Sequence, residues 1–191
     1  MTRNILLLRH GEVQGGAVYR GTTNDPLTPL GMQQMITATQ KYTWQHVTSS
    51  PLQRCAAFAE AQKTPITLDR RWQEIHFGDW EGQTYAQIEA QDQRRLEQFW
   101  RDPTSVTPPQ GESLSAFQRR IVQAWQDVCA QQHASQLIVT HGGPIRIIIA
   151  QLTGLPLAKL MDIRVPHACL SHVQIKCDGQ HLCTQSVNDP C

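Results

Sequence analysis

The chain has 191 residues, a length that favours a single domain. Its 17 Lys and Arg residues nearly balance its 16 Asp and Glu residues, and the net charge of +1 argues against a surface for nucleic acids or other polyanions. No apolar run approaches the roughly 20 residues of a membrane span. The first apolar run ends at Arg9 and His10 instead of continuing as a secretory signal, so we expect a cytoplasmic protein with no membrane partner.

The cysteines form no Cys-x-x-Cys pair, and they are Cys55, Cys129, Cys169, Cys177, Cys183 and Cys191. In a reducing compartment we expect six free thiols, mostly buried. A bridge between Cys177 and Cys183 is the alternative.

The N-terminal half alternates short apolar runs with helical patterns. Thr28 followed by Pro29 is typical of a helix start, and Ser50 followed by Pro51 repeats this signal. The expected elements are a strand at Asn4–Leu8, a helix from Thr28 to about Tyr42, a strand at His46–Ser49, a helix at Leu52–Gln62 and a strand at Pro65–Leu68.

The C-terminal half continues this alternation after a proline-containing loop. Pro103, Pro108 and Pro109 make the segment Arg101–Gly111 a predicted loop. The other expected elements are a helix at Thr84–Trp100, a helix capped by Ser113 and running to about Gln132, a strand at Leu137–Thr140, a helix at Pro144–Leu152, and a hairpin over Leu170–Ser186 around Asp178–Gly179.

Strands separated by helices at this spacing predict an α/β fold. We expect three layers, with a mostly parallel central sheet and helices on both of its faces. No linker is long enough to separate two full domains, so residues 1–191 are expected to form one domain. The segment from about 72 to 111 is interpreted as a helical and loop elaboration over the sheet.

Two predicted strands end in the same way. The segment Leu6–Gly11 is repeated in type by Ile138–Gly143, and each delivers a His-Gly pair at the carboxyl end of a buried strand. Ligands of open α/β sheets bind in the crevice outside these carboxyl ends. If the two strands are neighbours, His10 and His141 meet in one crevice.

Other residues expected at this edge favour an anion. Arg9 adjoins the first histidine, and Arg54 lies in the first turn of the helix that follows the strand at His46–Ser49. Gly142 and Gly143 begin a helix whose unpaired N–H groups attract negative charge. Two arginines, two histidines and a helix N-terminus together predict a phosphate site.

Phosphate held beside an imidazole suggests attack on phosphorus by a neutral ring nitrogen, with arginines stabilising the transition state. A general acid must then protonate the leaving oxygen, and the residues alone leave Glu74, Asp79 and Glu81 as candidates. Alternatively, His10 and His141 are core histidines or zinc ligands, although no third ligand has a suitable spacing.

Six ordered blocks give the sequence a resemblance to the histidine phosphatase superfamily, which includes the cofactor-dependent phosphoglycerate mutases. The blocks are Arg9-His10-Gly11-Glu12; Tyr19-Arg20-Gly21 with Asn24 to Thr28 and Gly31; Ser49 to Cys55; Glu74 to Gly82; Gly111-Glu112-Ser113; and Thr140 to Gly143 with Ile145-Arg146. They span Leu6 to about Arg146, so the resemblance covers most of the chain.

The resemblance implies a fold like that of phosphoglycerate mutase and a role for each matched residue. His10 would become the phosphohistidine, Arg9 and Arg54 would hold the phosphate, and His141 would complete the pocket. Glu74, the first glutamate of its block, would be the proton donor. The family needs neither a metal nor an organic cofactor, so none is expected.

One departure from the family pattern concerns the segment after the first block. Many members have an Asn there that touches phosphate, and this chain has Gln14–Ala17 instead. We hypothesise that Arg20 replaces that contact, and we expect Arg20, Gly21 and Gly142 to bind substrate. Glu81 is expected to be structural.

The resemblance implies an enzyme acting on a small-molecule phosphate ester. A mutase needs a lid to protect its phosphohistidine from water, and 191 residues leave little material for one, which favours hydrolysis. The blocks look most like those of the alpha-ribazole phosphatases of cobalamin nucleotide-loop assembly, which implies alpha-ribazole 5′-phosphate as substrate. The alternatives are a broad-specificity sugar-phosphate phosphatase, a phosphoglycerate mutase, or a phosphoanion-binding module without turnover.

Several other conspicuous residues are expected to have no chemical role. Trp80, Trp100 and Trp125 are expected in the core, and Arg119–Arg120 is expected to be a solvated helix face. His167 belongs to no metal-binding spacing.

Overall fold

The structure is a computed structural model that describes residues 2–177 and 183–188. In chain order its strands and helices are β1 (Thr2–Arg9), α1 (Pro29–Thr39), β2 (His46–Ser49), α2 (Gln53–Glu60), β3 (Ile66–Leu68), η1 (Arg70–Trp72), η2 (Gly78–Trp80), α3 (Tyr85–Arg101), α4 (Leu114–Ala130), β4 (Ser135–Thr140), α5 (Gly142–Thr153), η3 (Leu157–Asp162), β5 (Leu170–Cys177) and β6 (Cys183–Asn188). The η elements are short 3₁₀ helices.

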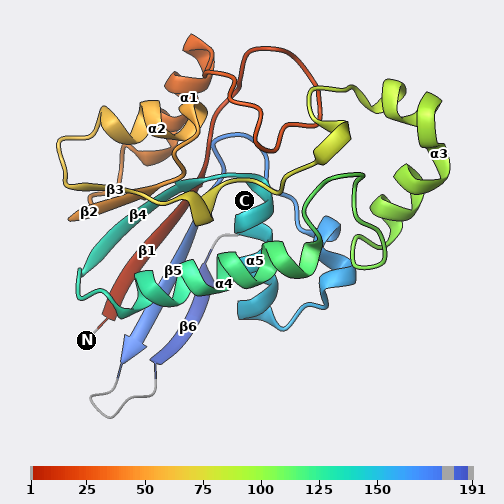
Figure 1. Cartoon of the computed structure of the whole chain (residues 1–191). Helices are drawn as coiled ribbons and strands as arrows, with labels where there is room; N and C mark the ends of the chain where they lie inside the picture. Colours follow the sequence, from red (N-terminus) through yellow and green to blue (C-terminus); the bar gives the residue numbers. More distant parts are fainter. Residues whose placement is uncertain (1, 178–182, 189–191) are drawn as a thin grey trace.

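Within the described residues the strands form one six-stranded sheet in the order β3-β2-β4-β1-β5-β6 (Figure 1). Neighbours from β3 to β1 are parallel, whereas β5 and β6 are antiparallel to their neighbours. The predicted mostly parallel sheet is confirmed, and so is the C-terminal antiparallel pair. The predicted turn at Asp178–Gly179 lies outside the described residues.

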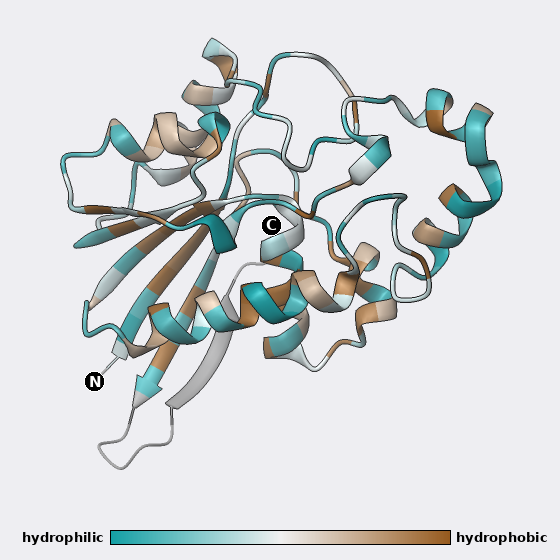
Figure 2. Cartoon of the chain, viewed as in Figure 1, coloured by the Kyte–Doolittle hydropathy of each residue, from teal (hydrophilic) through white to brown (hydrophobic). Residues whose placement is uncertain are grey.

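Helices cover both faces of the sheet, as predicted, because the central strands are apolar on both sides. In β1, Ile5 and Leu7 pack with α4 and α5, and Leu6 and Leu8 pack with α1 and α2. Figure 2 shows the apolar strands between these helices, whose outer faces are polar. None of the helices in the described part of the chain has both the length and the apolar character needed to cross a bilayer.

Two of the three predicted helix caps are confirmed. The Thr28 hydroxyl accepts a hydrogen bond from Gly31 N–H (2.9 Å), and the Ser113 hydroxyl accepts one from Ala116 N–H (3.3 Å). The predicted cap at Ser50 is wrong, because α2 begins after Leu52, which makes no side-chain cap. The Ser50 hydroxyl accepts only a long hydrogen bond from Leu52 N–H (3.4 Å), before the helix begins, and it lies 2.8 Å from Nε2 of His141.

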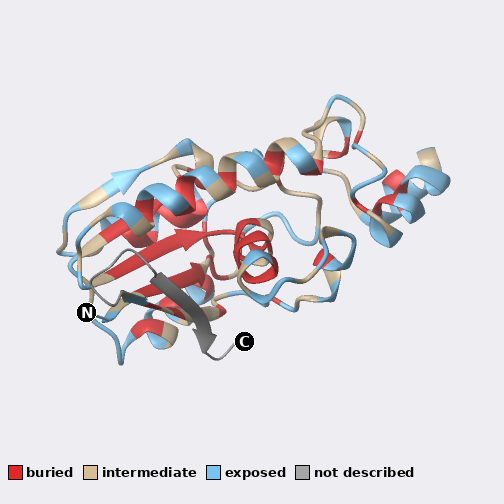
Figure 3. Ribbon diagram, turned by 90° about the horizontal axis from the view of Figure 1, so that it is seen from below, coloured by how far each residue is buried: buried red, intermediate tan, exposed pale blue. Residues whose placement is uncertain are grey.

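Helix α3 packs on a small cluster apart from the two faces of the sheet. Trp80, Ile88, Leu96 and Phe99 form this cluster, and Figure 3 shows the exposed outer surface of α3 at one end of the molecule. The backbone of Asp92 departs from helical geometry and kinks the helix. Trp80 and Trp125 are buried, as expected. The prediction of a core position is wrong for Trp100, which is 46% exposed.

The cysteines differ from the expectation of six free thiols. Cys55 is a buried free thiol. Cys169 is in a disulfide, so the expectation is wrong at this residue. Cys177 and Cys183 are opposite each other in the β5–β6 register. The suggested bridge between them stays a prediction, because the structure describes the backbone of these two residues and not their side chains.

Candidate active site

The two repeated strand ends lie side by side. In the parallel pairing of β1 with β4, Arg9 is opposite Thr140, and the N–H of His10 donates to the Thr140 carbonyl (3.0 Å). The His-Gly pairs therefore follow at the same level of the sheet. The rings of His10 and His141 meet edge to face, with centroids 5.2 Å apart. The predicted meeting of the two imidazoles is confirmed, but only His10 lines the cavity described below, since His141 is completely buried.

The environment of His10 prepares one of its ring nitrogens for attack. Nδ1 is 2.8 Å from the Gly11 carbonyl, and because a carbonyl only accepts, Nδ1 must carry the proton. The lone pair is then on Nε2. Burial, then the positive charges of Arg54 and Arg9, hold the pKa of His10 well below its usual value of 6.5. The ring is therefore neutral at pH 7.

His141 lies behind His10 and is completely buried. Its Nδ1 accepts a hydrogen bond from Nε of Arg54 (3.2 Å), so its proton is on Nε2, which faces the Ser50 hydroxyl. Burial, followed by the charge of Arg54, lowers the pKa of His141 well below 6.5. Because both nitrogens are engaged, this ring has a fixed orientation.

Arg54 extends from the first turn of α2 and is completely buried. Besides its bond to His141, it donates to the carbonyls of Thr23 (2.6 Å) and Gly21 (2.7 Å). Arg54 thus contacts the second histidine, as its predicted position implies, and fixes the loop before α1, but it is not among the residues that line the cavity over His10. Gly21, predicted to bind substrate, is buried, and its carbonyl serves this loop contact.

Arg9 keeps an unused donor at the site. Its Nη1 donates to the Val165 carbonyl (2.6 Å), but its Nε is buried and, among the residues that the structure describes, has no hydrogen-bond partner. A Cβ atom on Gly142 would lie 3.7 Å from this Nε and 3.0 Å from Nη1 of Arg146. The glycine therefore leaves room for two guanidinium groups beside the N-terminus of α5.

A cavity of about 400 Å³ opens over His10. The residues that line it are Arg9, His10, Val13, Ala17, Val18, Tyr19, Arg20, Glu74, Phe77, Tyr85, Trp100, Arg146 and His167. The cavity thus combines arginine side chains with a group of four aromatic side chains, here called the aromatic wall: Tyr19, Phe77, Tyr85 and Trp100. Arg146, His167 and Trp100 are not among the predicted site residues, although Arg146 belongs to the last of the six sequence blocks. No local pattern indicates His167 or Trp100, because the turn before β5 and helix α3 come to the cavity only through tertiary packing.

Glu74 is the acidic residue of its block that lines this cavity. Its Oε2 accepts the N–H of Gly143 (3.0 Å) at the N-terminus of α5, and its Oε1 accepts the N–H of Ile75 (3.0 Å). The carboxylate therefore takes one of the helix N–H groups that the sequence had suggested for phosphate. Asp79, the alternative acid, is on the exposed surface.

Glu81 has the structural role expected of it. Its carboxylate accepts the backbone N–H groups of Gly21, Thr22, Thr23 and Phe77. Burial alone would raise the pKa of Glu81, but the hydrogen bonds, led by that from the Thr23 hydroxyl, lower it overall. Glu81 is thus a half-buried anion that holds the loop around Gly21 in place.

Arg20 lines the cavity, but its guanidinium is largely occupied. Its Nε forms an ion pair with Asp25 (2.6 Å), and its Nη2 donates to the carbonyls of Gln14 (2.9 Å) and Gly16 (3.2 Å). Arg20 therefore closes the loop that departs from the family pattern. The hypothesis that it contacts phosphate stays a prediction.

The interpretation of Arg119–Arg120 as a solvated face is correct for Arg119 and wrong for Arg120. Arg119 is exposed. Arg120 forms a two-point ion pair with Glu112 (2.8 and 2.7 Å) and donates to the Glu74 carbonyl (2.9 Å). It fixes the backbone that carries the predicted proton donor.

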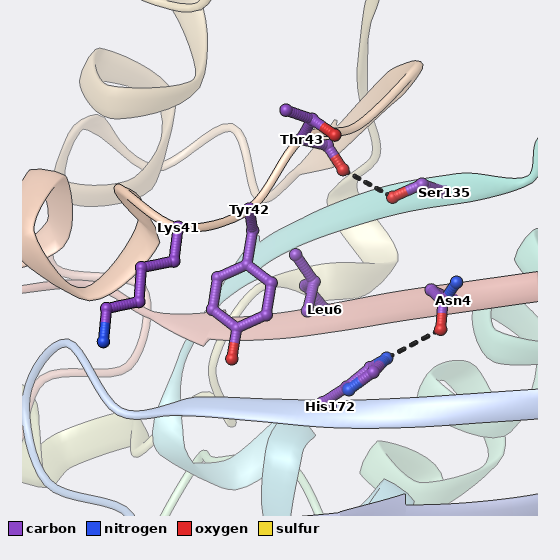
Figure 4. Close-up of a pocket in the computed structure, with 7 residues that line it drawn as sticks. All are labelled: Asn4, Leu6, Lys41, Tyr42, Thr43, Ser135 and His172. Carbon is purple, nitrogen blue, oxygen red and sulfur yellow. Dashed lines mark hydrogen bonds between the residues drawn. The ribbon is translucent and has the colours of Figure 1, made fainter.

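A separate cavity of about 330 Å³ lies near the amino ends of β1 and β4 (Figure 4). It contains a hydrogen bond between His172 and Asn4 (2.8 Å), but no arginine or carboxylate is among its described lining residues. In the described residues no group of three or more His, Cys, Asp or Glu is arranged to hold a metal ion. The predicted phosphate chemistry thus fits the cavity over His10 best.

Comparisons with known proteins agree with this geometry. The family model of the histidine phosphatase superfamily (branch 1) matches residues 5–188. The adenosylcobalamin/alpha-ribazole phosphatase of Escherichia coli K12 is 29% identical over 182 residues, covering 88% of each chain. The structure of Bacillus stearothermophilus YhfR superposes with a TM-score of 0.86 at 28% identity, covering 97% of this chain and 95% of that one. A mycobacterial glucosyl-3-phosphoglycerate phosphatase in complex with inorganic phosphate gives 0.80 at 25% identity, covering 98% and 96%.

Proposed function

The chain belongs to the histidine phosphatase superfamily (branch 1) and is a phosphomonoesterase of small phosphate esters, and we propose that it hydrolyses alpha-ribazole 5′-phosphate through a phosphohistidine on His10. The observation that carries the proposed mechanism is the state of His10, a buried neutral imidazole with a free lone pair on Nε2. It faces a cavity lined by arginines and one carboxyl group.

In the first half-reaction, Nε2 of His10 attacks phosphorus and the bond from phosphorus to the ester oxygen breaks. Protonated Glu74 gives its proton to that oxygen, so the alcohol leaves neutral. Arg9 and Arg54 offset the negative charge of the phosphoryl oxygens. The unused Nε of Arg9 is the donor most available to them.

In the second half-reaction, water attacks the same phosphorus from the side that the alcohol has left. Glu74, now a carboxylate, takes a proton from this water, and the bond between phosphorus and Nε2 breaks. Inorganic phosphate leaves, and His10 and protonated Glu74 are restored. The carboxyl group therefore serves first as acid and then as base.

The aromatic wall of the cavity supports the proposal that the alcohol part of the substrate carries a planar ring. Tyr19, Phe77, Tyr85 and Trp100 line the cavity, and Trp100 Nε1 donates to the Tyr19 hydroxyl (2.6 Å). Planar heterocycles stack well on such surfaces. The benzimidazole of alpha-ribazole is a ring of this kind, and the E. coli relative bears this substrate in its name.

Trapping of the phosphoenzyme tests the mechanism. Wild-type protein quenched during turnover of a ³²P-labelled ester should carry acid-labile, base-stable label, His10→Ala should carry none, and turnover should persist with a chelator present. An active enzyme that never carries label would refute the phosphohistidine.

A panel of esters tests the substrate. Burying a planar ring stabilises by about 1.5–3 kcal/mol, so kcat/KM for alpha-ribazole 5′-phosphate should exceed that for ribose 5-phosphate or 3-phosphoglycerate by roughly 10- to 100-fold. Trp100→Ala should reduce this preference. Equal values across the panel would favour a broad-specificity phosphatase.

A further inference from the structure

The turn before β5 is tied to the nucleophile strand by three hydrogen bonds. Arg9 donates to the Val165 carbonyl through Nη1 (2.6 Å) and to the Cys169 carbonyl through its backbone N–H (2.9 Å). The N–H of Ala168 donates to the His10 carbonyl (3.0 Å). Arg9 and His10, two residues of the candidate active site, therefore hold this turn in position.

His167 lies within this turn, and the backbone directs it to the cavity. The next residue, Ala168, has φ of 54°, in the left-handed region that is costly for alanine. Such strain persists where surrounding contacts impose it, and it is frequent at functional sites. The His167 ring is centred 5.5 Å from the His10 ring, and it lines the cavity together with Arg9.

We propose that His167 is a further catalytic residue, which donates an N–H hydrogen bond to a non-bridging oxygen of the phosphoryl group on His10. This inference rests on the proposed phosphohistidine. The unused Nε of Arg9 would hold the same group, so two donors from separate segments would fix it between them. Partial burial and the charge of Arg9 lower the pKa of His167, but a neutral imidazole still carries one N–H.

Two substitutions separate hydrogen bonding from packing. His167→Leu removes the donor, and His167→Gln keeps an N–H donor on a neutral side chain. Arg164→Gln, in the same loop and exposed, is the matched control. The readouts are the inhibition constant of orthovanadate, kcat and KM for an aryl and an alkyl phosphate, and the melting temperature of each variant.

We expect His167→Leu to weaken vanadate inhibition by about 10- to 100-fold, the range of a hydrogen bond to a charged group. The loss of kcat/KM should be equal for the aryl and alkyl esters, because the contact is with the phosphoryl group and not with the leaving oxygen. His167→Gln should stay within about threefold of wild type, and Arg164→Gln should be unchanged.

Two results would overturn the inference. If His167→Leu binds vanadate as wild type does while its phosphoenzyme is still trapped, His167 does not touch the phosphoryl group and the proposed mechanism survives. If His167→Gln loses as much as His167→Leu, donation of an N–H is not what the residue supplies. Absence of a phosphoenzyme in wild-type protein would instead refute the proposed mechanism itself.

Discussion

Replacing Arg120 by leucine should destabilise the protein and misplace its proton donor. All five N–H groups of this guanidinium have acceptors: two go to the Glu112 carboxylate, and the others go to the carbonyls of Arg71 (2.7 Å), Gln73 (2.7 Å) and Glu74 (2.9 Å). The substitution would remove every one of these bonds. It would also leave Glu112 without its cation.

The magnitude follows from the burial of the pair. Breaking a fully buried ion pair costs about 3–5 kcal/mol, but the Arg120 and Glu112 side chains are 23% and 18% exposed, so water can replace part of the loss. We expect a decrease in unfolding free energy of about 2–4 kcal/mol, or roughly 5–15 °C in melting temperature. The exposed neighbour provides the control, since Arg119→Leu should stay within about 0.5 kcal/mol of wild type.

The kinetic effect should depend on the leaving group. Arg120→Lys keeps the charge but has three donors instead of five, so it loosens the backbone of Glu74 with less damage to folding. An alkyl phosphate needs protonation of its leaving oxygen and should lose at least tenfold in kcat/KM, whereas 4-nitrophenyl phosphate should lose far less. An unchanged melting temperature in Arg120→Leu, or equal losses on both esters in Arg120→Lys, would refute the reasoning.

Two further expectations concern the buried histidines and the close packing at Gly143. Because the pKa values of His10 and His141 are lowered in the folded state, the unfolded chain binds protons first. Unfolding free energy should therefore fall below about pH 6.5, by up to about 2.7 kcal/mol per pH unit for both rings. Urea titrations between about pH 7.5 and 5.5 would measure this, and a constant value would contradict neutral buried rings. In Gly143→Ala, the new Cβ would overlap Oε1 of Glu74. It should lower kcat/KM for alkyl esters at least tenfold, and full activity in steady-state assays would show that Glu74 tolerates displacement.

The parts of the fold and site that depend on local patterns could be predicted from the sequence. The apolar run before His10 and the similar run before His141 marked buried strands, and their shared ending placed both histidines at one edge of the sheet. Thr28 and Ser113 are caps because their hydroxyls find the nearest free N–H groups. Ser50 carries the same local signal but faces His141 in the folded protein.

The parts that depend on distant contacts could not be predicted in this way. Arg120 bonds to carbonyls 46 to 49 positions away, and no spacing in the sequence distinguishes it from Arg119. His167 reaches the site because its turn is tied to β1, and Trp100 reaches it because α3 packs on its own small cluster. The roles of these residues could be identified only from the folded structure.

The buried cations explain why phosphate suits this site better than a neutral ligand. The guanidinium of Arg54 is held by carbonyls and His141, so little reorganisation is needed when substrate arrives. Arg9 differs, because its Nε is buried without a partner among the described residues. An unsatisfied buried donor costs about 1–3 kcal/mol. A phosphoryl oxygen can recover that cost, whereas an apolar ligand would leave it in place, and so the position of this donor favours an anion.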